Sequence, residues 1–468
     1  MAPPGWVRDA IFYQIFPDRF ANGDPSNDPP QVQPWGAPPT TRDFQGGDLQ
    51  GIHDHLDYLS DLGVDAIYLN PIFQAGSNHR YNASDYLRVD DRLGSLEDFR
   101  RLLRGAHDRG IRVVLDGVFN HSGRGFFAFQ DLLDHGEASP CGHWYHVRSF
   151  PLDAFGENGK ARNYEAWWGM RNLPKFNTED PEVRAYLLKV ARYWVEQGID
   201  GWRLDVPNEI PDLAFWGEVR DVVTNANPEA VLLGEIWSVS PAWVGPGVFD
   251  GLMNYPLRQS LLELAVERTL SPQGFADQVQ AQYDAYPEAF RGTHYNLLGS
   301  HDTPRVATLA ARDGRTVRLL NALLFALPGA PSVYYGDEIG LEGGKDPDCR
   351  RAFEWDRSRW DADLRDFIKS LIRLRRSRVE LRRGDLRFLP AAGDGSVLAF
   401  VRNSGAGTFL LAANMGEGVS SAQLDVSGIG WAGHREVVDS LTGRTTPIAD
   451  GKLDFELAPL GFLALHDS

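Results

Sequence analysis

Three acidic residues at the ends of short apolar runs are the first candidates for chemistry in this chain. The distance along the sequence from Asp205 to Glu235 fits one strand–helix unit, and the distance from Glu235 to Asp302 fits two. Carboxylates that share one pocket repel each other, so their pKa values separate, and one can stay protonated while another stays ionised. A general acid beside an ionised nucleophile is the arrangement that retaining glycoside hydrolysis requires.

Neighbouring polar residues support this interpretation. Arg203 lies two residues before Asp205, so on a strand both side chains face the same way, and the charge of Arg203 would keep Asp205 ionised. Other apolar runs end in Asp116, His121 and His301. Any one of the three carboxylates could instead be a structural cap or one half of an ion pair. Three of them in register favour a catalytic site.

The elements that would position these residues are eight short apolar runs separated by amphipathic segments. Continuous apolar runs are typical of strands buried on both faces, and eight of them alternating with helices predict a parallel (β/α)8 TIM barrel. Ser95–Arg109 and Asp180–Glu196 are predicted helices, the second with a capping Asp180 followed by Pro181. The predicted strands are Ala10–Phe16, Asp65–Leu69, Arg112–Val118, Gly201–Val206, Ala230–Ile236, Gly251–Asn254, Tyr295–Gly299 and Ser332–Tyr335.

Changes of pattern along the chain predict its domain organisation. Residues 1–119 carry the first three strands of the barrel, and residues 178–380 carry its remainder. Residues 120–177 between them are too many for one loop and predict a small domain inserted after strand 3. Residues 381–468 contain short strands with Gly turns, which predict a C-terminal antiparallel β-sandwich domain. Its expected strands are Ser396–Val401, Thr408–Ala413, Arg435–Asp439 and Leu453–Leu457.

The composition excludes several classes of protein. With 43% hydrophobic and 24% charged residues, the chain is neither disordered nor fibrous. A formal net charge of −17 argues against nucleic acid or an anionic membrane as the main partner. No apolar run has the length of a membrane span, no signal peptide is visible, and two cysteines cannot form a disulfide framework. These observations predict a cytoplasmic protein.

Four motifs resemble those of one enzyme family, and they stand in that family's order and spacing. The family is the α-amylase family, glycoside hydrolase family 13, and the resemblance covers the whole chain. It implies that Asp205 is the nucleophile, Glu235 the acid/base, and Asp302 a third carboxylate that stabilises the transition state. The motifs are D-G-V-F-N-H (Asp116–His121), G-W-R-L-D-V-P-N-E (Gly201–Glu209), G-E-I-W (Gly234–Trp237) and N-L-L-G-S-H-D-T-P-R (Asn296–Arg305).

The same resemblance implies a set of substrate contacts. Tyr81 is the expected stacking platform under the sugar at the cleavage point, and His79 belongs to the same wall. Asp116 and Asn120 are expected to hold the site together rather than to touch the substrate. The other expected sugar ligands are His121, Arg203, Glu209, Trp237 and His301.

Further segments are similar to the neopullulanase, cyclomaltodextrinase and maltogenic amylase group of the family. In that group Asp346 and Arg350 would line the substrate rim, although Asp337, Glu338 and Asp346 could equally form a solvated acidic loop. The segments are L-P-K-F-N (Leu173–Asn177), V-P-N-E (Val206–Glu209) and the stretch Tyr334–Arg351.

The loop Asn22–Phe44 is rich in Pro, Asn and Asp, and is expected to be irregular. The segment F-A-N-G-D-P-S-N-D-P (Phe20–Pro29), with F-Q-G-G-D (Phe44–Asp48), supplies oxygen ligands that suit Ca²⁺, and it is similar to a calcium site of the group. A plain Asx turn is the alternative interpretation. The expected calcium ligands are Asn22, Asp24, Asn27, Asp28, Gly46 and Asp48.

The group resemblance implies a retaining hydrolase of α-1,4 bonds in maltooligosaccharides, cyclodextrins, pullulan or starch, with transglycosylation. Its partner would be a neutral α-glucan. A 4-α-glucanotransferase on the same site is the alternative, and a non-catalytic glucan-binding protein is disfavoured by the intact carboxylates. The group usually has an N-terminal β domain before the barrel, whereas strand 1 is expected here at Ala10–Phe16. We therefore expect a monomer or a weak dimer with a more open cleft.

Overall fold

Eight parallel strands form the central sheet of the protein. The computed structural model describes residues 2–155, 159–431 and 433–467. The strand order is β8-β7-β6-β5-β2-β1-β10-β9, and a parallel bridge from Met253 to Tyr295 joins the β8 side to β9. The predicted TIM barrel is therefore confirmed. Its strands are β1 (Phe12–Ile15), β2 (Ala66–Leu69), β5 (Arg112–Gly117), β6 (Gly201–Leu204), β7 (Val231–Gly234), β8 (Gly251–Leu252), β9 (Tyr295–Asn296) and β10 (Ala330–Tyr334).

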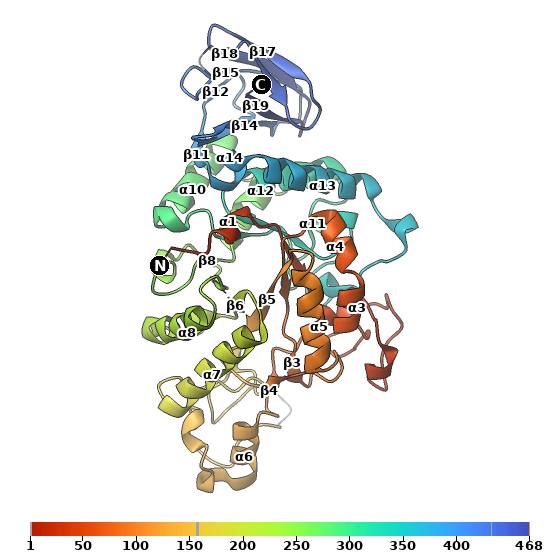
Figure 1. Cartoon of the computed structure of the whole chain (residues 1–468), viewed down its shortest axis with the longest axis vertical. Coiled ribbons are helices and arrows are strands. Elements are labelled where there is room, and N and C mark those ends of the chain that lie inside the picture. The colour runs from red at the N-terminus through yellow and green to blue at the C-terminus, as the bar shows by residue number, and fades with distance from the viewer. Residues whose placement is uncertain (1, 156–158, 432, 468) are drawn as a thin grey trace.

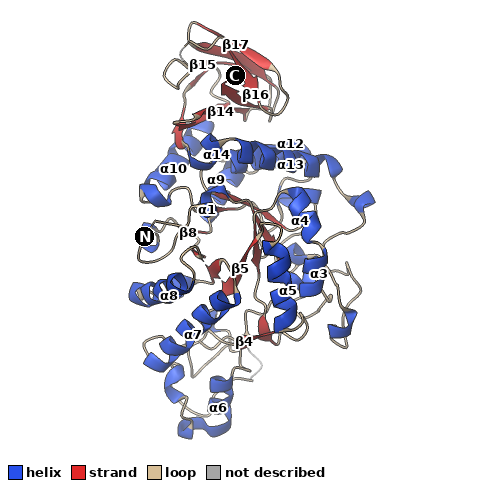
Figure 2. Cartoon of the chain, viewed as in Figure 1, coloured by secondary structure: helices blue, strands red, loops and turns tan. Residues whose placement is uncertain are grey.

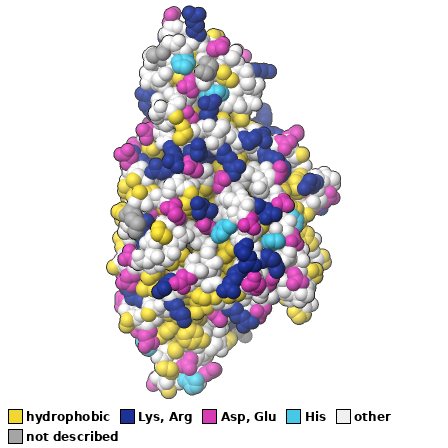
Figure 3. Space-filling view, viewed as in Figure 1, with side chains coloured by type: hydrophobic (Ala, Val, Ile, Leu, Met, Phe, Trp, Pro, Cys, Tyr) yellow, Lys and Arg dark blue, Asp and Glu magenta, His cyan; other side chains and the backbone are white. Residues whose placement is uncertain are grey.

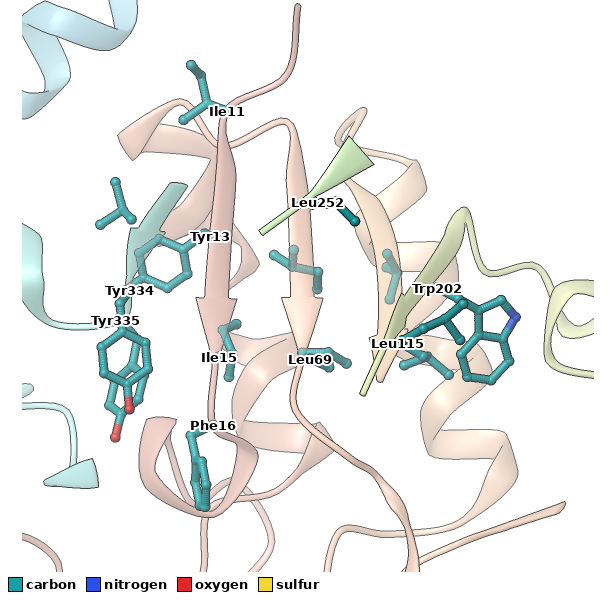
Figure 4. Close-up of a cluster of buried hydrophobic side chains, with 14 of the residues drawn as sticks. Ile11, Tyr13, Ile15, Phe16, Leu69, Leu115, Trp202, Leu252, Tyr334 and Tyr335 are labelled. Atoms are coloured by element: carbon teal, nitrogen blue, oxygen red, sulfur yellow. The ribbon is translucent and has the colours of Figure 1, made fainter. Parts of the chain in front are cut away.

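The barrel strands are buried on both faces, which explains why they read as continuous apolar runs. Every residue of β1, β2, β6 and β7 is buried. Figure 4 shows side chains such as Ile15, Leu69 and Leu115 packed between neighbouring elements. Each predicted strand overlaps an observed one, but the observed strands are mostly shorter at their ends, and β10 starts two residues earlier, at Ala330.

Helices surround the strands of the barrel (Figure 2). Both predicted helices are present as α5 and α7. Ser95 caps α5 in a capping box with Asp98, and Asp180 accepts hydrogen bonds from the first turn of α7. The helices are α1 (Trp6–Asp9), α2 (Pro17–Phe20), α3 (Leu49–Asp54), α4 (Leu56–Leu62), α5 (Leu96–His107), α6 (Phe127–His135), α7 (Pro181–Gln197), α8 (Leu213–Ala226), α9 (Tyr255–Ala265), α10 (Pro272–Asp284), α11 (Val306–Leu309), α12 (Gly314–Ala326), α13 (Ala362–Ser377) and α14 (Val379–Arg383).

The segment between β5 and α7 contains α6, three 3-10 helices and several isolated bridges rather than a sheet. Bridges from His121 to Lys175 and from Tyr145 to Phe176 tie its two ends together beside the barrel. A two-stranded ribbon, β3 (Phe73–Ala75) with β4 (Ala83–Val89), follows β2. Figure 1 shows α6 at one end of the long axis and the C-terminal sheet at the other.

The C-terminal part is one nine-stranded antiparallel sheet that curls around its own core. The buried cluster between its parts includes Leu410, Leu424, Trp431, Leu453 and Leu465. The four predicted strands are present, and the sequence missed five more. The strands are β11 (Asp385–Phe388), β12 (Ala391–Ala392), β13 (Val397–Ser404), β14 (Gly407–Asn414), β15 (Ser420–Asp425), β16 (Glu436–Asp439), β17 (Thr445–Ala449), β18 (Lys452–Leu457) and β19 (Phe462–Asp467).

Across the part of the chain that the structure describes, no helix has both the length and the apolar character needed to cross a membrane. The two cysteines, Cys141 and Cys349, are both free thiols.

Candidate active site

The guanidinium of Arg203 is the centre of the site at the carboxyl ends of the barrel strands. Its Nη1 lies 2.7 Å from Asp116 Oδ1 and 3.1 Å from Asp205 Oδ1, and its Nη2 lies 2.8 Å from Glu235 Oε2. Arg203 belongs to β6, Asp205 follows that strand, Asp116 is on β5 and Glu235 follows β7. Three adjacent strands therefore deliver three carboxylates to one cation, as the spacing along the sequence predicted for Asp205 and Glu235.

Both oxygens of Glu235 are held by hydrogen bonds. Oε2 accepts from the backbone N–H of Val206 at 3.1 Å in addition to its contact with Arg203, and Oε1 accepts from Trp237 Nε1 at 3.1 Å. Val206 adopts a left-handed backbone conformation with φ of 35°, which is strained for a β-branched residue. This conformation belongs to the turn that directs its N–H to the carboxylate.

Opposing charges and burial act on the carboxyl group of Asp205. Burial and the charge of Glu235 raise the pKa of Asp205, and Arg203 opposes this shift without overcoming it. The charge of Arg203 thus favours the ionised form of Asp205, as expected, while burial and Glu235 favour the protonated form. Asp116, Asp205 and Glu235 all contact this single guanidinium, so three acidic side chains share one positive charge.

Asp302 lies on the open side of the site. Its side chain is 30% exposed, against 9% for Asp205 and 5% for Glu235. Asp302 Oδ1 lies 3.3 Å from Arg350 Nη2, and Arg350 Nη1 lies 3.1 Å from Asp346 Oδ1. The surrounding pocket and the charge of Glu235 raise the pKa of Asp302, whereas Arg350 lowers it.

Tyr81 and His301 lie flat against each other in one wall of the site. Their rings are 5.4 Å apart and inclined by 6°. The Tyr81 hydroxyl donates to Asp116 Oδ2 at 2.8 Å, so at 2.6 Å from His301 Nε2 it accepts that ring's proton. Burial and the charge of Arg350 lower the pKa of His301 well below its usual value, in keeping with a neutral ring. His79 extends this wall, with its ring 5.9 Å from that of Tyr81.

Two residues of this wall were missed by the sequence analysis. Gln14 Nε2 and Asn70 Nδ2 lie 2.8 and 3.1 Å from His301 Nδ1, and both donate to it because the ring proton is on Nε2. Gln14 also donates to Asn70 Oδ1 at 3.0 Å. Asn70 directly follows β2 and fits the rule of a polar residue ending an apolar strand, so that rule could have found it.

His121 lies on the side of the inserted segment. Its ring is 5.5 Å from that of Trp167, which stacks in turn on Trp168 at 4.6 Å. Burial lowers the pKa of His121 to about 3, so the ring is neutral. His121 Nε2 is buried and has no hydrogen-bond partner among the described residues. An unpaired buried nitrogen in a cleft is suited to bind a substrate hydroxyl.

Two further predicted site residues, Trp237 and Glu209, follow β7 and β6. Trp237 is 51% exposed, and its ring stacks on Tyr255 at 3.7 Å. Glu209 is half-buried in the short helix after Val206, and its carbonyl accepts from Lys175 Nζ at 2.9 Å. This bond ties the inserted segment to the barrel rim.

The alternative of a solvated acidic loop is wrong for two of its three residues. Asp337 is buried against Arg305 Nη1 at 2.8 Å, and Glu338 is buried against the hydroxyls of Tyr13 and Tyr58. Asp346, the third, is 43% exposed beside Arg350.

The loop after β1 brings together most of the residues predicted to bind calcium. Asn22 Nδ2 donates to both oxygens of Asp28, and Asn27 Nδ2 donates to Asp48 Oδ2 at 3.2 Å. A Cβ on Gly46 would lie 2.3 Å from Asp28 Oδ1, so only glycine fits there. Asp24 is exposed and turns away to form an Asx turn with Ser26.

Two oxygens of this loop match a cation better than they match a simple turn. Asn22 Oδ1 and Asn27 Oδ1 are buried and accept no hydrogen bond from the described residues. Nowhere in residues 2–155, 159–431 and 433–467 do three or more His, Cys, Asp or Glu side chains form a metal-binding group. A cation here would therefore rely on amide oxygens together with carboxylates.

A parallel barrel with three buried carboxylates on one guanidinium, a further carboxylate on the open side and an aromatic wall is an arrangement suited to a glycoside hydrolase. The chain belongs to the alpha-amylase family, since the family's catalytic domain matches residues 14–382. This confirms the resemblance carried by the four motifs, and the chain is an alpha-amylase family glycoside hydrolase.

Comparisons with individual proteins agree with this assignment. A "Cyclomaltodextrinase" from Bacillus sp is 46% identical over 88% of this chain and 74% of its own. An "Intracellular maltogenic amylase" from Bacillus subtilis is 43% identical over 80% of this chain and 62% of its own. The structure of a cyclic alpha-maltosyl-(1→6)-maltose hydrolase from Arthrobacter globiformis superposes with a TM-score of 0.90 at 41% identity, covering 100% of both chains.

Proposed function

We propose that the protein hydrolyses α-1,4-glucosidic bonds in neutral α-glucans with retention of configuration, by double displacement. The observation that carries this proposal is the pair of contacts from one Arg203 guanidinium to Asp205 and Glu235. These contacts hold the nucleophile and the acid/base close to each other, and a short separation of the two carboxyl groups is what distinguishes retaining from inverting glycosidases. The names of the relatives above support a substrate built of α-linked glucose.

In the first step a carboxylate oxygen of Asp205 forms a bond to the anomeric carbon, and the glycosidic bond breaks. Glu235 gives its proton to the departing oxygen. Because Arg203 and the Val206 N–H occupy Oε2, the transferable proton belongs on Oε1, which faces Trp237. In the second step Glu235 takes a proton from water, whose oxygen bonds to the anomeric carbon and releases Asp205.

The other site residues bind and orient the sugar at the cleavage point. Asp302 accepts sugar hydroxyls, and Arg350 holds it in place with Asp346 at the rim. Tyr81 is the stacking platform, supported by His301 and His79. Glu209 and Trp237 are further proposed substrate contacts. His121 is another, and its Nε2 atom would bind a sugar hydroxyl.

Parallel digests of β-cyclodextrin, pullulan and soluble starch test the activity. We expect all or some of these to be cleaved, with products that first appear as the α-anomer in ¹H NMR spectra. Glu235→Gln should lose at least about 10³-fold in kcat, whereas the exposed Glu229→Gln should not change it. A Glu235→Gln variant with full activity would disprove the acid/base assignment.

Transglycosylation is proposed as a side activity, because both outcomes share every catalytic residue. The relatives described above are named as hydrolases or amylases, so they do not favour the 4-α-glucanotransferase alternative. Incubation with pure maltotriose separates the two. Glucose and maltose as main products are expected, and longer oligosaccharides as main products would reverse the assignment.

We also propose a structural Ca²⁺ in the loop after β1. The buried, unpaired Asn22 Oδ1 and Asn27 Oδ1 support it, together with the carboxylates of Asp28 and Asp48. The remaining proposed ligands are the carbonyl of Gly46 and Asp24, whose carboxylate would have to leave its Asx turn with Ser26 to reach the ion. When bound, the ion would link the loop to the start of α3, which Asp48 caps.

Melting temperatures test the calcium proposal. We expect Tm to rise on adding CaCl2 after EGTA treatment, and we expect Asp28→Ala to lose this response. The exposed Asp57→Ala should keep it. A wild-type Tm that is the same in EGTA and in CaCl2 would contradict the calcium site. It would favour the alternative interpretation, a plain Asx turn.

The protein is further proposed to act as a cytoplasmic monomer or weak dimer that binds neither nucleic acid nor membrane. Figure 3 shows acidic and basic side chains intermixed over one face rather than gathered by sign, which supports a neutral partner. The relative named as intracellular supports the location. Light scattering over a concentration series and cell fractionation test these points.

A further inference from the structure

A groove of about 340 Å³ opens beside Trp237, on the side of α9 and α10. Trp237 and Tyr255 form one side of it, and α9 and α10 contribute Gln259, Gln278 and Gln282. Its size lies near the lower end of small-molecule sites, about 300 to 1,000 Å³. The groove adjoins the catalytic centre, because Trp237 lines it and also donates to Glu235 Oε1.

The amides of Gln278 and Gln282 have a fixed orientation in this groove. Their Nε2 atoms lie 2.8 and 3.0 Å from Ser260 Oγ. Ser260 is fully buried, and its hydroxyl donates to the Pro256 carbonyl at 3.0 Å. A hydroxyl that has given its proton to a carbonyl can only accept from the two amides. Both glutamines therefore turn their Oε1 atoms away from Ser260 as hydrogen-bond acceptors for other groups.

The charge of the groove selects a neutral ligand. Its lining contains no acidic residue among the described ones, and Arg258 is its only cation. The Arg258 guanidinium is buried, and two of its five N–H donors are held by the carbonyls of Leu298 and Pro304. What remains is an indole ring beside carboxamide acceptors. This combination suits a polyol with an apolar face and several hydroxyl donors.

We infer that this groove is an outer subsite for the leaving part of the glucan, in which Gln278 and Gln282 accept hydrogen bonds from its hydroxyls. The inference rests on the proposed hydrolysis. Glu235 protonates the leaving oxygen through Oε1, on the Trp237 side, so the leaving sugars extend over Trp237. The groove lies beyond that ring and binds the same ligand class further from the cleavage point.

A comparison of long and short substrates distinguishes the effect of this subsite on kcat/KM from that of the catalytic centre. The double variant Gln278→Met/Gln282→Met removes both acceptors with little change of shape. We expect its kcat/KM on maltohexaose to fall about 10- to 50-fold, because each lost hydrogen bond is worth about two- to tenfold. On 4-nitrophenyl α-maltoside, whose leaving group is too short to fill the groove, kcat/KM should stay within twofold. Reducing-end-labelled maltohexaose should release shorter labelled fragments than with the wild type.

Gln280→Met is the matched control. It lies on the same helix, and its amide donates to Asp284 outside the groove, so both substrates should behave as with the wild type. If the double variant melts more than about 5 °C lower, the single variants and Ser260→Ala, which frees both amides, replace it. A double variant that matches Gln280→Met on maltohexaose overturns the subsite and leaves the hydrolysis standing. A wild type that cleaves neither substrate overturns the proposed function and the subsite with it.

Discussion

Arg203 fixes the geometry of three carboxylates through the fork of its guanidinium. Two nitrogens of one planar group reach Asp116, Asp205 and Glu235 at 2.7 to 3.1 Å. A lysine ammonium is a single point charge and cannot hold the same three partners in place. The separation between nucleophile and acid therefore depends on the residue type at this position as well as on its charge.

We predict that Arg203→Lys lowers kcat/KM on maltooligosaccharides at least about 100-fold, because small misplacements of reacting groups have effects of that size. Steady-state kinetics measure this loss. The exposed pair of Arg88 with Asp91 supplies the control variant Arg88→Lys, which should not change the rate. A lysine variant within threefold of the wild type would contradict the role of the fork.

The pH dependence of the reaction gives a second test at the residue scale. Arg350 lowers the pKa of Asp302, and Asp346 raises it. If ionised Asp302 is needed, kcat/KM falls as the pH drops through that pKa. Arg350→Met should therefore move the acidic limb of the pH profile of kcat/KM to higher pH, by about half a unit or more.

Asp346→Asn is the matched variant of opposite sign. It removes the charge that raises the pKa of Asp302, so the acidic limb should move to lower pH. Two limbs that move in the same direction, or not at all, would show that Asp302 does not control the acidic side of the profile.

The sequence predicted the charged residues of the site, but it missed Gln14 and Asn70, which form hydrogen bonds with His301. Acidic residues and histidines at strand ends are conspicuous, because such residues are rarely buried without a reason. Gln14 is the third residue of the four-residue strand β1, and nothing local shows that it faces His301. Contacts of this kind depend on how strands far apart in sequence lie side by side, which a one-dimensional pattern does not contain.

At the scale of elements, burial decided which strands could be predicted. The barrel strands are buried along almost their whole length and read as apolar runs. In the C-terminal sheet, β17 has no buried residue and β15 consists mostly of polar or small residues. Such strands form because neighbouring strands pair with them, so their own composition gives little signal.

Arg402 joins the barrel to the C-terminal sheet. It lies on β13, is 1% exposed, and donates from Nη1 to the Ala326 carbonyl at 2.6 Å, at the end of α12. Its Nε and Nη2 both donate to the Gly384 carbonyl. Burial lowers the pKa of Arg402 to about 10, so the group remains charged at neutral pH.

We predict that Arg402→Met lowers the free energy of unfolding by about 2 to 4 kcal/mol, because it leaves two buried carbonyls without donors. Chemical denaturation followed by fluorescence measures the change. The exposed Arg444→Met, in the same sheet region, should change stability by less than about 0.5 kcal/mol. Equal stabilities of the two variants would mean that water replaces the guanidinium at this junction.

At the scale of the whole molecule, the carboxylate of Glu338 lies where three parts of the barrel meet. It follows β10 and accepts hydrogen bonds from Tyr13 of β1 at 2.7 Å and Tyr58 of α4 at 2.5 Å. Glu338 is fully buried, and its Oε2 has no partner among the described residues. Burial raises the pKa of Glu338 above its ordinary value, with the two tyrosine hydroxyls opposing the shift.

A raised pKa in the folded state means that folding favours the protonated acid. The stability this gives is fully present at low pH and is lost as the pH rises through the folded-state pKa. Glu338→Gln keeps a neutral side chain of the same shape at every pH. We therefore predict that the Tm of Glu338→Gln relative to the wild type increases between pH 5 and pH 9, by about 2 °C. The exposed Glu288→Gln should show a constant difference over this range, since its carboxylate stays in water when the chain folds. A constant difference for Glu338→Gln as well would mean that the two hydroxyls compensate for burial, and that this carboxylate is ionised in the folded barrel.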